Sequence, residues 1–234
     1  MTVDAENLAM RVQKLGVPQK RILKVYFGID DGIFHPPSED RVPSGDKTAP
    51  VIISTRKLYP LYNVGLLIEA AQKVLERFPE ARFVICGDGP ERTALEKRTG
   101  ELGLTNNVSF KGTLSTEELA RELREADIYV STSMSDSTSV SLLEAMACAA
   151  VPVVSDIEAN REWVENGKNG FLFDPHDAAD LASAIVSLFE DRETLSRAKE
   201  QNIVIIREKA LWRDNMEKVE KEFARLVDEA GGTQ

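Results

Sequence analysis

Short apolar runs, rich in β-branched residues, alternate with amphipathic stretches from position 50 onward. The runs predicted as strands are Val51–Ser54, Arg82–Cys86, Val108–Lys111, Ile128–Thr132, Val151–Ser155 and Gly170–Phe173. Most are nearly continuous in apolar residues, as strands buried on both faces of a parallel sheet are. The alternation of strands and helices predicts an α/β fold, a single Rossmann-like doubly wound parallel sheet.

The stretches between the strands carry apolar residues at helical spacing. Positions 64–75 form one apolar stripe, Ser115 and Glu118 form a capping box, and positions 177–190 place their leucines on one face. Doubly wound sheets bind ligands outside the carboxyl ends of their strands. The loops that follow the strands are therefore the candidates for chemistry.

The two ends of the chain follow other patterns. Residues 4–15 predict a short helix, Arg21–Phe27 a strand, and the polar residues 38–49 an exposed connection. The highly charged stretch Glu200–Ala230 predicts an extra helix with Trp212, Met216, Val219, Phe223 and Leu226 as its apolar stripe.

The net charge and the composition limit which binding partners are expected. The formal net charge of −10 disfavours nucleic acid and anionic lipid as general partners. The N-terminus has no basic flank or apolar core, and no run approaches the roughly 20 apolar residues of a membrane span. We therefore expect a cytoplasmic protein. Cys86 and Cys148 lie in apolar runs, which predicts buried free thiols.

Three loops carry candidate chemistry. In the first, Arg56 and Lys57 follow a strand; they could clamp a diphosphate or be solvated surface cations. In the second, Gly87 and Gly89 allow close approach of a ligand to the backbone, or simply a tight turn. The second loop lacks the Gly-x-Gly-x-x-Gly fingerprint of dinucleotide binding.

The third loop runs from Ser131 to Val140 and opens a helix that contains Glu144. Its hydroxyl residues can cap the helix, and free N–H groups at a helix start form an anion site. Glu144 could accept hydrogen bonds from a ribose diol, or simply favour the helix dipole.

Several motifs together resemble the C-terminal domain of family 4 retaining glycosyltransferases of the GT-B fold, from about residue 20 to about residue 200. Val84-Ile-Cys-Gly-Asp-Gly-Pro-Glu-Arg92 is similar to the family's VIVGDGPER. Glu144-Ala-Met-Ala-Cys148 and Val151-Pro-Val-Val-Ser-Asp156 resemble EAMACGxPVVaSD, and Asn166 to Leu172 resembles NGxxGxL.

The resemblance implies roles for particular residues. Asp136 and Glu144, separated by seven residues, would contact the donor sugar and the nucleotide ribose. Arg56 and Lys57 would stabilise the leaving diphosphate. The other residues that it implies in donor binding are Thr138, Ser139, Val140, Gly87, Gly89, Lys111 and Gly112. The donor would be a UDP-, GDP- or ADP-linked sugar of hexose type, and no cofactor or metal is expected because no Asp-x-Asp occurs.

This sequence departs from the family pattern at several positions. The family's phosphate-binding Arg and Lys align with Lys57 and Tyr62, so the second cation is lost unless Arg56 replaces it. Ser137-Thr-Ser139 stands in place of Gly-Phe-Gly, which puts the sugar preference in doubt. Ala149 occupies a position where glycine is common.

The resemblance also implies how the chain divides into domains, and it implies an N-terminal acceptor domain that this sequence does not contain. We predict a linker helix over 1–20, a nucleotide-sugar-binding domain over 21–199 and a crossover helix and tail over 200–234. Neither His35 nor His176 matches the family's catalytic histidine, which lies in an N-terminal acceptor domain. We expect the chain to be inactive without that domain, through which any membrane contact would occur. A nucleotide-sugar epimerase and a non-catalytic nucleotide-binding or docking module are the alternatives.

Overall fold

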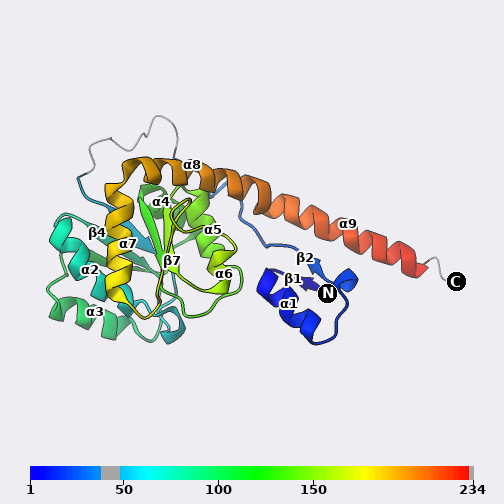
Figure 1. Cartoon of the computed structure of the whole chain (residues 1–234), viewed down its shortest axis with the longest axis horizontal. Helices are drawn as coiled ribbons and strands as arrows, with labels where there is room; N and C mark the ends of the chain where they lie inside the picture. Colours follow the sequence, from blue (N-terminus) through cyan, green and yellow to red (C-terminus); the bar gives the residue numbers. More distant parts are fainter. Residues whose placement is uncertain (38–47, 232–234) are drawn as a thin grey trace.

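A computed structural model describes residues 1–37 and 48–231, so most of the predicted connection over 38–49 lies outside the described residues. Its centre is a six-stranded sheet in the order β5-β4-β3-β6-β7-β8, and every neighbouring pair is parallel (Figure 1). The strands are β3 (Val51–Ser54), β4 (Arg82–Cys86), β5 (Val108–Gly112), β6 (Ile128–Ser131), β7 (Val151–Ser155) and β8 (Phe171–Phe173). The predicted α/β fold is confirmed.

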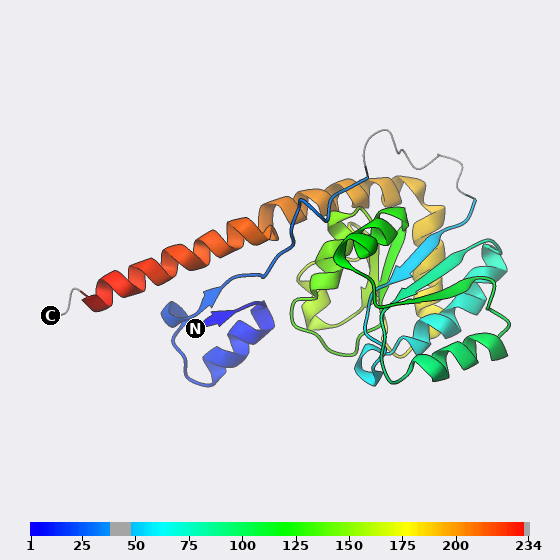
Figure 2. The ribbon, with the colours of Figure 1, turned by 180° about the vertical axis from the view of Figure 1, so that it is seen from behind.

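Helices cover both faces of the sheet (Figure 2). They are α2 (Gly65–Arg77), α3 (Arg92–Glu101), α4 (Thr116–Glu125), α5 (Val140–Ala147), α6 (Glu158–Arg161), α7 (Ala178–Glu190) and α8 (Arg192–Lys209). Ile52 points into the core beneath α2 and α7, whereas its neighbour Ile53 points into the core beneath α4 and α5. Because successive strand residues are buried on opposite faces, the strands read as continuous apolar runs.

The predicted helix over Glu200–Ala230 is wrong in one respect, because the structure divides it. Helix α8 ends at Lys209, and a separate helix α9 covers Trp212–Gly231. Between them, the Ile29 N–H donates to the Ala210 carbonyl at 2.8 Å, and the Trp212 N–H donates to the Ile29 carbonyl at 2.9 Å. These long-range bonds take backbone groups that a continuous helix would use. The predicted boundary at 199/200 falls inside α8.

Residues 1–27, here called the N-terminal unit, form a small assembly with a two-stranded sheet of its own, bonded to the main part of the chain through Glu162 and residues 137–138. It contains β1 (Thr2–Val3), α1 (Glu6–Lys14), a 3-10 turn over Gln19–Arg21 and β2 (Leu23–Lys24). The predicted helix is confirmed, but the predicted strand over Arg21–Phe27 shortens to β2, which pairs in parallel with β1. This pairing spans the predicted boundary at residue 20.

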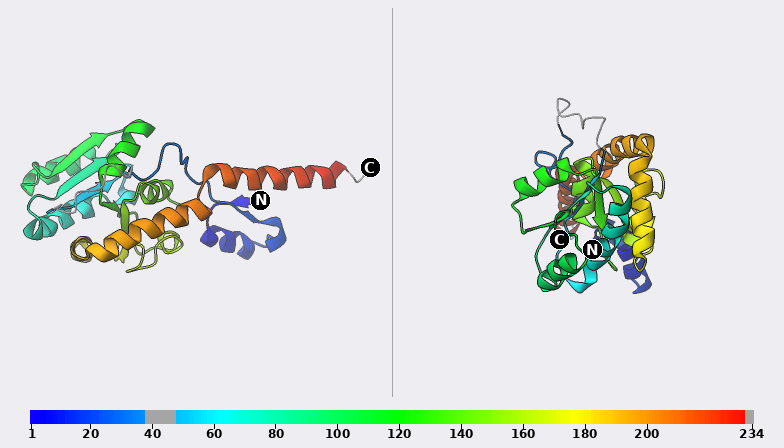
Figure 3. Two further views of the ribbon diagram at one scale, coloured as in Figure 1. Left: turned by 90° about the horizontal axis from the view of Figure 1, so that it is seen from above. Right: turned by 90° about the vertical axis from the view of Figure 1, so that its left-hand side faces the viewer.

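Helix α9 extends away from the sheet with the N-terminal unit beside it (Figure 3). Cavities of about 540 and 300 Å³ lie between the two, and Phe223 lines both. Phe223 is 58% exposed, and Leu226 and Trp212 are also exposed. Among the described residues, no helix combines the length and hydropathy that a membrane crossing requires.

Candidate functional site

The candidate site lies where the direction of sheet winding reverses. From β3 the chain continues to β4 and β5 on one side, and from β6 it continues to β7 and β8 on the other. The loops after β3 and β6 therefore diverge from adjacent strands, which is where doubly wound sheets bind ligands. Arg56 and Lys57 belong to the first of these loops, and Asp136 to Ser139 belong to the second.

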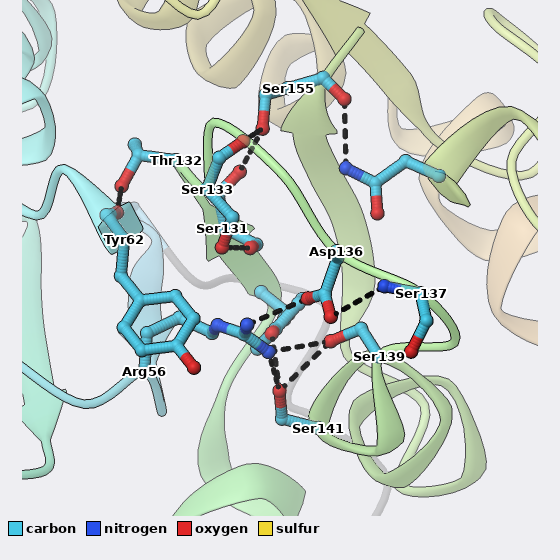
Figure 4. Close-up of polar contacts among 12 residues, drawn as sticks. Arg56, Tyr62, Ser131, Thr132, Ser133, Asp136, Ser137, Ser139, Ser141 and Ser155 are labelled. Atoms are coloured by element: carbon cyan, nitrogen blue, oxygen red, sulfur yellow. Dashed lines mark hydrogen bonds and ion pairs between the residues drawn. The ribbon is translucent and has the colours of Figure 1, made fainter. Parts of the chain in front are cut away.

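The Arg56 side chain extends from the loop after β3 to the loop after β6 and forms hydrogen bonds with it (Figure 4). Its Nη2 lies 2.6 Å from Asp136 Oδ2, and its Nη1 donates to Ser139 Oγ at 2.7 Å and to Ser141 Oγ at 2.8 Å. Arg56 is only 8% exposed. Burying a charge is costly unless the charge is paired and hydrogen-bonded, and the Arg56 guanidinium meets both conditions.

Tyr62 supports Arg56 from the other side. The guanidinium carbon lies 4.3 Å from the centroid of the Tyr62 ring, within the range of a cation–π interaction. The Thr132 hydroxyl donates to the Tyr62 carbonyl at 2.7 Å and ties the two loops together again. Tyr62 thus restrains the guanidinium of Arg56 through both its ring and its backbone carbonyl's bond to the second loop.

Helix α5 begins at this cluster with its first turn uncapped by a side chain. Ser139 is the N-cap residue, yet its hydroxyl makes no capping bond. The oxygen is instead engaged by Arg56 and lies 3.1 Å from Ser141 Oγ. Uncapped N–H groups at a helix start favour an anion, through both hydrogen bonding and the helix dipole.

The Gly87 and Gly89 turn is explained by backbone packing. A Cβ atom on Gly87 would lie less than 3.0 Å from the Arg56 carbonyl oxygen, and one on Gly89 equally close to that of Leu58. Gly87 also has a φ of 148°, in the region that favours glycine. These glycines let the loop after β4 pack against the loop after β3, so they position Arg56 and Lys57.

Lys57 is exposed and lines a cavity of about 410 Å³ at the carboxyl ends of β3 and β4. The other lining residues are Thr55, Tyr59, Cys86, Gly87, Asp88, Gly89, Thr113, Leu114 and Leu119. Gly112 precedes Thr113 with a φ of 69°, and its carbonyl accepts from the Gly87 N–H at 2.8 Å. Lys111 is not among the lining residues, and it pairs with Glu122 at 3.3 Å.

Glu144 and Val140 lie on α5 itself. Val140 is partly exposed in the first turn, while Glu144 is half-buried one turn later. Burial raises the pKa of Glu144 from 4.5 to about 7. No ion pair or side-chain hydrogen bond of Glu144 is present within residues 1–37 and 48–231. A half-buried carboxylate without a partner has acceptor capacity for a ligand.

Thr138 faces away from the helix start, toward the N-terminal unit. Its hydroxyl donates to the Asp4 carbonyl, and the Ser137 hydroxyl donates to Asp4 Oδ2 at 3.2 Å. Sequence reasoning missed this contact, because no local signal links positions more than 130 residues apart. Ser141 was expected at the helix start, but its hydroxyl's contact with Arg56 at 2.8 Å was not predicted.

No group of three or more His, Cys, Asp or Glu side chains that could hold a metal ion occurs in the described part of the chain. Cys86 and Cys148 are buried free thiols, as predicted, and burial raises the pKa of each to about 12.

Solved structures share the fold of this chain. Sucrose-phosphate synthase from Thermosynechococcus elongatus superposes with a TM-score of 0.85 at 19% identity, over 97% of this chain and 58% of that one. The Anabaena protein HepE in complex with UDP-glucose gives 0.82 at 20% identity, over 96% of this chain and 63% of that one. The six-stranded parallel sheet with its flanking helices therefore matches the fold of GT-B glycosyltransferases.

Sequence relatives with curated names are glycosyltransferases. The chain is 31% identical over 176 residues to a sulfoquinovosyl transferase of Arabidopsis thaliana, covering 71% of this chain and 33% of the relative. It is 32% identical over 214 residues to a D-inositol 3-phosphate glycosyltransferase of Mycolicibacterium smegmatis, covering 86% of this chain and 48% of the relative. The chain thus spans between a third and a half of these relatives.

The model of one protein family, described as glycosyl transferases group 1, matches residues 38–204. The match covers all six strands of the main sheet and the site loops between them. It therefore covers well over half of the chain and the whole candidate site. The chain belongs to the group 1 glycosyltransferases.

Proposed function

We propose that this chain is the donor-binding part of a retaining glycosyltransferase, similar to family 4, that transfers a hexose-type sugar from a nucleotide-diphosphate sugar. The observation that carries the proposal is the convergence of Arg56, Asp136 and an uncapped helix start where the sheet winding reverses. This arrangement offers a positive electrostatic environment beside a carboxylate, which suits a diphosphate attached to a sugar.

Each part of the donor has a matching part of the site. The diphosphate lies against the first turn of α5, with Lys57 as the exposed cation. Asp136 faces the sugar, and Glu144 accepts from the ribose hydroxyls. The base enters the cavity of about 410 Å³ lined by the loops after β3, β4 and β5.

The leaving diphosphate gains negative charge as the glycosidic bond breaks, and this charge must be stabilised without reorganisation. The α5 N–H groups are fixed by the helix before the donor arrives, and the exposed Lys57 adds a cation at the mouth of the site. No metal is needed in this scheme, because the helix start and the cations supply the positive charge. Departure and attack on the same face of the sugar would give retention.

The acceptor site lies on another domain in this proposal. That domain would dock on the apolar surface formed by α9 and the N-terminal unit, where Phe223 and Leu226 are exposed beside two cavities. The chain alone would then bind donor nucleotide and transfer nothing. Docking of the acceptor domain on this surface is therefore a second role of the chain, beside donor binding at the sheet.

Calorimetric titration with UDP, GDP and ADP tests donor binding. We expect one nucleotide to bind, and Glu144→Ala to weaken that binding by roughly 1–3 kcal/mol because a charged acceptor is lost. Glu220→Ala, at an exposed position on α9, is the matched control and should leave affinity unchanged. Absence of binding to all three nucleotides at millimolar concentration would contradict the proposal.

A further inference from the structure

Arg56 is poorly placed to contact a phosphate directly. Its side chain is almost entirely buried, and both of its terminal nitrogens are already bonded to the loop after β6. Tyr62 covers the guanidinium. The exposed cation of the pair is its neighbour Lys57.

The contacts of Arg56 determine what the Ser139 hydroxyl can do. A serine at the N-cap ordinarily accepts from an N–H group of the first helical turn. Ser139 does not, because its oxygen accepts from Arg56 Nη1 at 2.7 Å and lies beside Ser141 Oγ. Among the described residues, the first-turn N–H groups of α5 are consequently left without a side-chain acceptor, while the Leu142 N–H donates to the Ser139 carbonyl at 3.0 Å.

Asp136 is restrained in the same way. One carboxylate oxygen pairs with Arg56 Nη2 at 2.6 Å, and the other accepts from the Ser137 N–H at 3.0 Å. A free carboxylate this close to a helix start would itself be attracted to the N–H groups there. The pairing with Arg56 holds it aside.

We propose that Arg56 is a positioning residue, which keeps the start of α5 open for the donor diphosphate by holding the Ser139 hydroxyl and the Asp136 carboxylate away from it. This inference rests on the proposed donor-binding function and deepens it. The three polar contacts need a planar fork with several donors in fixed directions, which lysine lacks. The flat guanidinium also stacks on Tyr62, so the Arg56–Tyr62 pair acts as one unit.

Four forms of the 234-residue chain test this role: wild type, Arg56→Gln, Ser139→Ala and the double variant. Each is titrated with UDP, GDP and ADP, and then with the nucleoside of whichever nucleotide binds wild type. Arg56→Gln should weaken nucleotide binding about ten-fold and leave nucleoside binding unchanged, since the freed hydroxyl and carboxylate then compete for the N–H groups.

The double variant provides the decisive comparison. Removal of the Ser139 hydroxyl from Arg56→Gln deletes the competing cap, so nucleotide affinity should recover about five-fold. A residue with a purely structural role, or one that contacts phosphate directly, would show no such rescue. Arg77→Gln, which removes an exposed arginine paired with Glu190, is the control and should bind like wild type.

Circular dichroism and thermal unfolding verify that each variant is folded, and Arg56→Lys replaces Arg56→Gln if the latter is not. Unchanged nucleotide affinity in the Arg56 variant, or additive losses in the double variant, would overturn the positioning role alone. A wild-type chain that binds none of the three nucleotides would overturn the proposed function, and the inference with it.

Discussion

Glu144 is the titratable residue of the site whose charge changes near neutral pH, with a pKa raised by burial from 4.5 to about 7. The folded chain holds this proton more tightly than the unfolded chain, so the free energy of unfolding falls as pH rises from 4.5 through about 7. Glu144→Gln should remove this part of the pH dependence. Thermal unfolding of both proteins across the range measures it.

Nucleotide binding should show the opposite dependence on pH. The ionised carboxylate is the stronger acceptor for ribose hydroxyls, so affinity should rise as Glu144 loses its proton near pH 7. Phosphate also titrates in this region, and Glu144→Gln serves as the reference that isolates its contribution. A pH profile that is identical in the two proteins would exclude Glu144 from the ribose site.

Lys57 should act through its charge. Lys57→Ala is expected to weaken binding of a nucleoside diphosphate by about 1 kcal/mol, with little effect on the nucleoside. The loss should shrink at high salt, because Lys57 is exposed and its interactions are screened. Lys73→Ala, an exposed lysine on α2, is the control for a general change in net charge. Equal losses in the two variants would contradict a local role.

At the scale of residues, sequence patterns identified which side chains meet but not how. Arg56 was a candidate because it follows a strand, and Asp136 and Ser139 were candidates because of the family resemblance. The structure brings the three side chains together. The patterns could not show that Arg56 is buried while Lys57 is exposed, because adjacent loop residues have no periodicity. The contacts of Asp4 with Ser137 and Thr138 depend on the fold of the whole chain.

The C-terminal end of α5 offers a prediction for a single element. Ala149 follows the C-cap residue and has a φ of 65°, the left-handed conformation that helix ends commonly assign to glycine. Ala149→Gly should stabilise the chain by about 1 kcal/mol, because glycine adopts this conformation without the Cβ penalty. Denaturant unfolding measures it.

Ala147→Gly, inside the same helix, is the matched control and should destabilise by about 1 kcal/mol or more, since it also removes a buried methyl group. A loss of stability in both variants would contradict the prediction, because it would mean that Ala149 does not adopt the left-handed conformation in solution. The family's preference for glycine at this position thus has a conformational cause.

Helices and strands could be predicted where a single local pattern of apolar residues marks them. Strands β3, β4, β6 and β7 are buried on both faces, and their apolar runs located them to within one residue. The edge strands β5 and β8 are less buried, yet their predicted bounds are also within one residue. The division between α8 and α9 was not predictable, because the residues on both sides continue a helical pattern. The deciding bonds come from Ile29, about 180 positions earlier in the chain.

At the scale of the whole molecule, the apolar surface of α9 and the N-terminal unit should promote association of the chain on its own. Phe223→Glu combined with Leu226→Glu should reduce self-association in analytical ultracentrifugation without lowering stability, because both side chains are exposed. Val204→Glu changes a similarly exposed position on α8, 50% accessible and away from the cavities, and should have no effect. Association that persists in the double variant would assign it to another surface.

The order of the sheet has a consequence for how the chain folds. Strands β3, β4 and β5 are neighbours in sequence and in the sheet, and so are β6, β7 and β8. Within the sheet, the two halves are joined by the pairing of β3 with β6, here called the seam, through two paired positions compared with four between β3 and β4. Because distant pairings incur the cost of loop closure before they gain contacts, each half can form before this seam closes. Arg56 and Asp136 lie on opposite sides of the seam, so their pairing reports that the two halves have joined, and a chain with only one half folded would lack the proposed donor site.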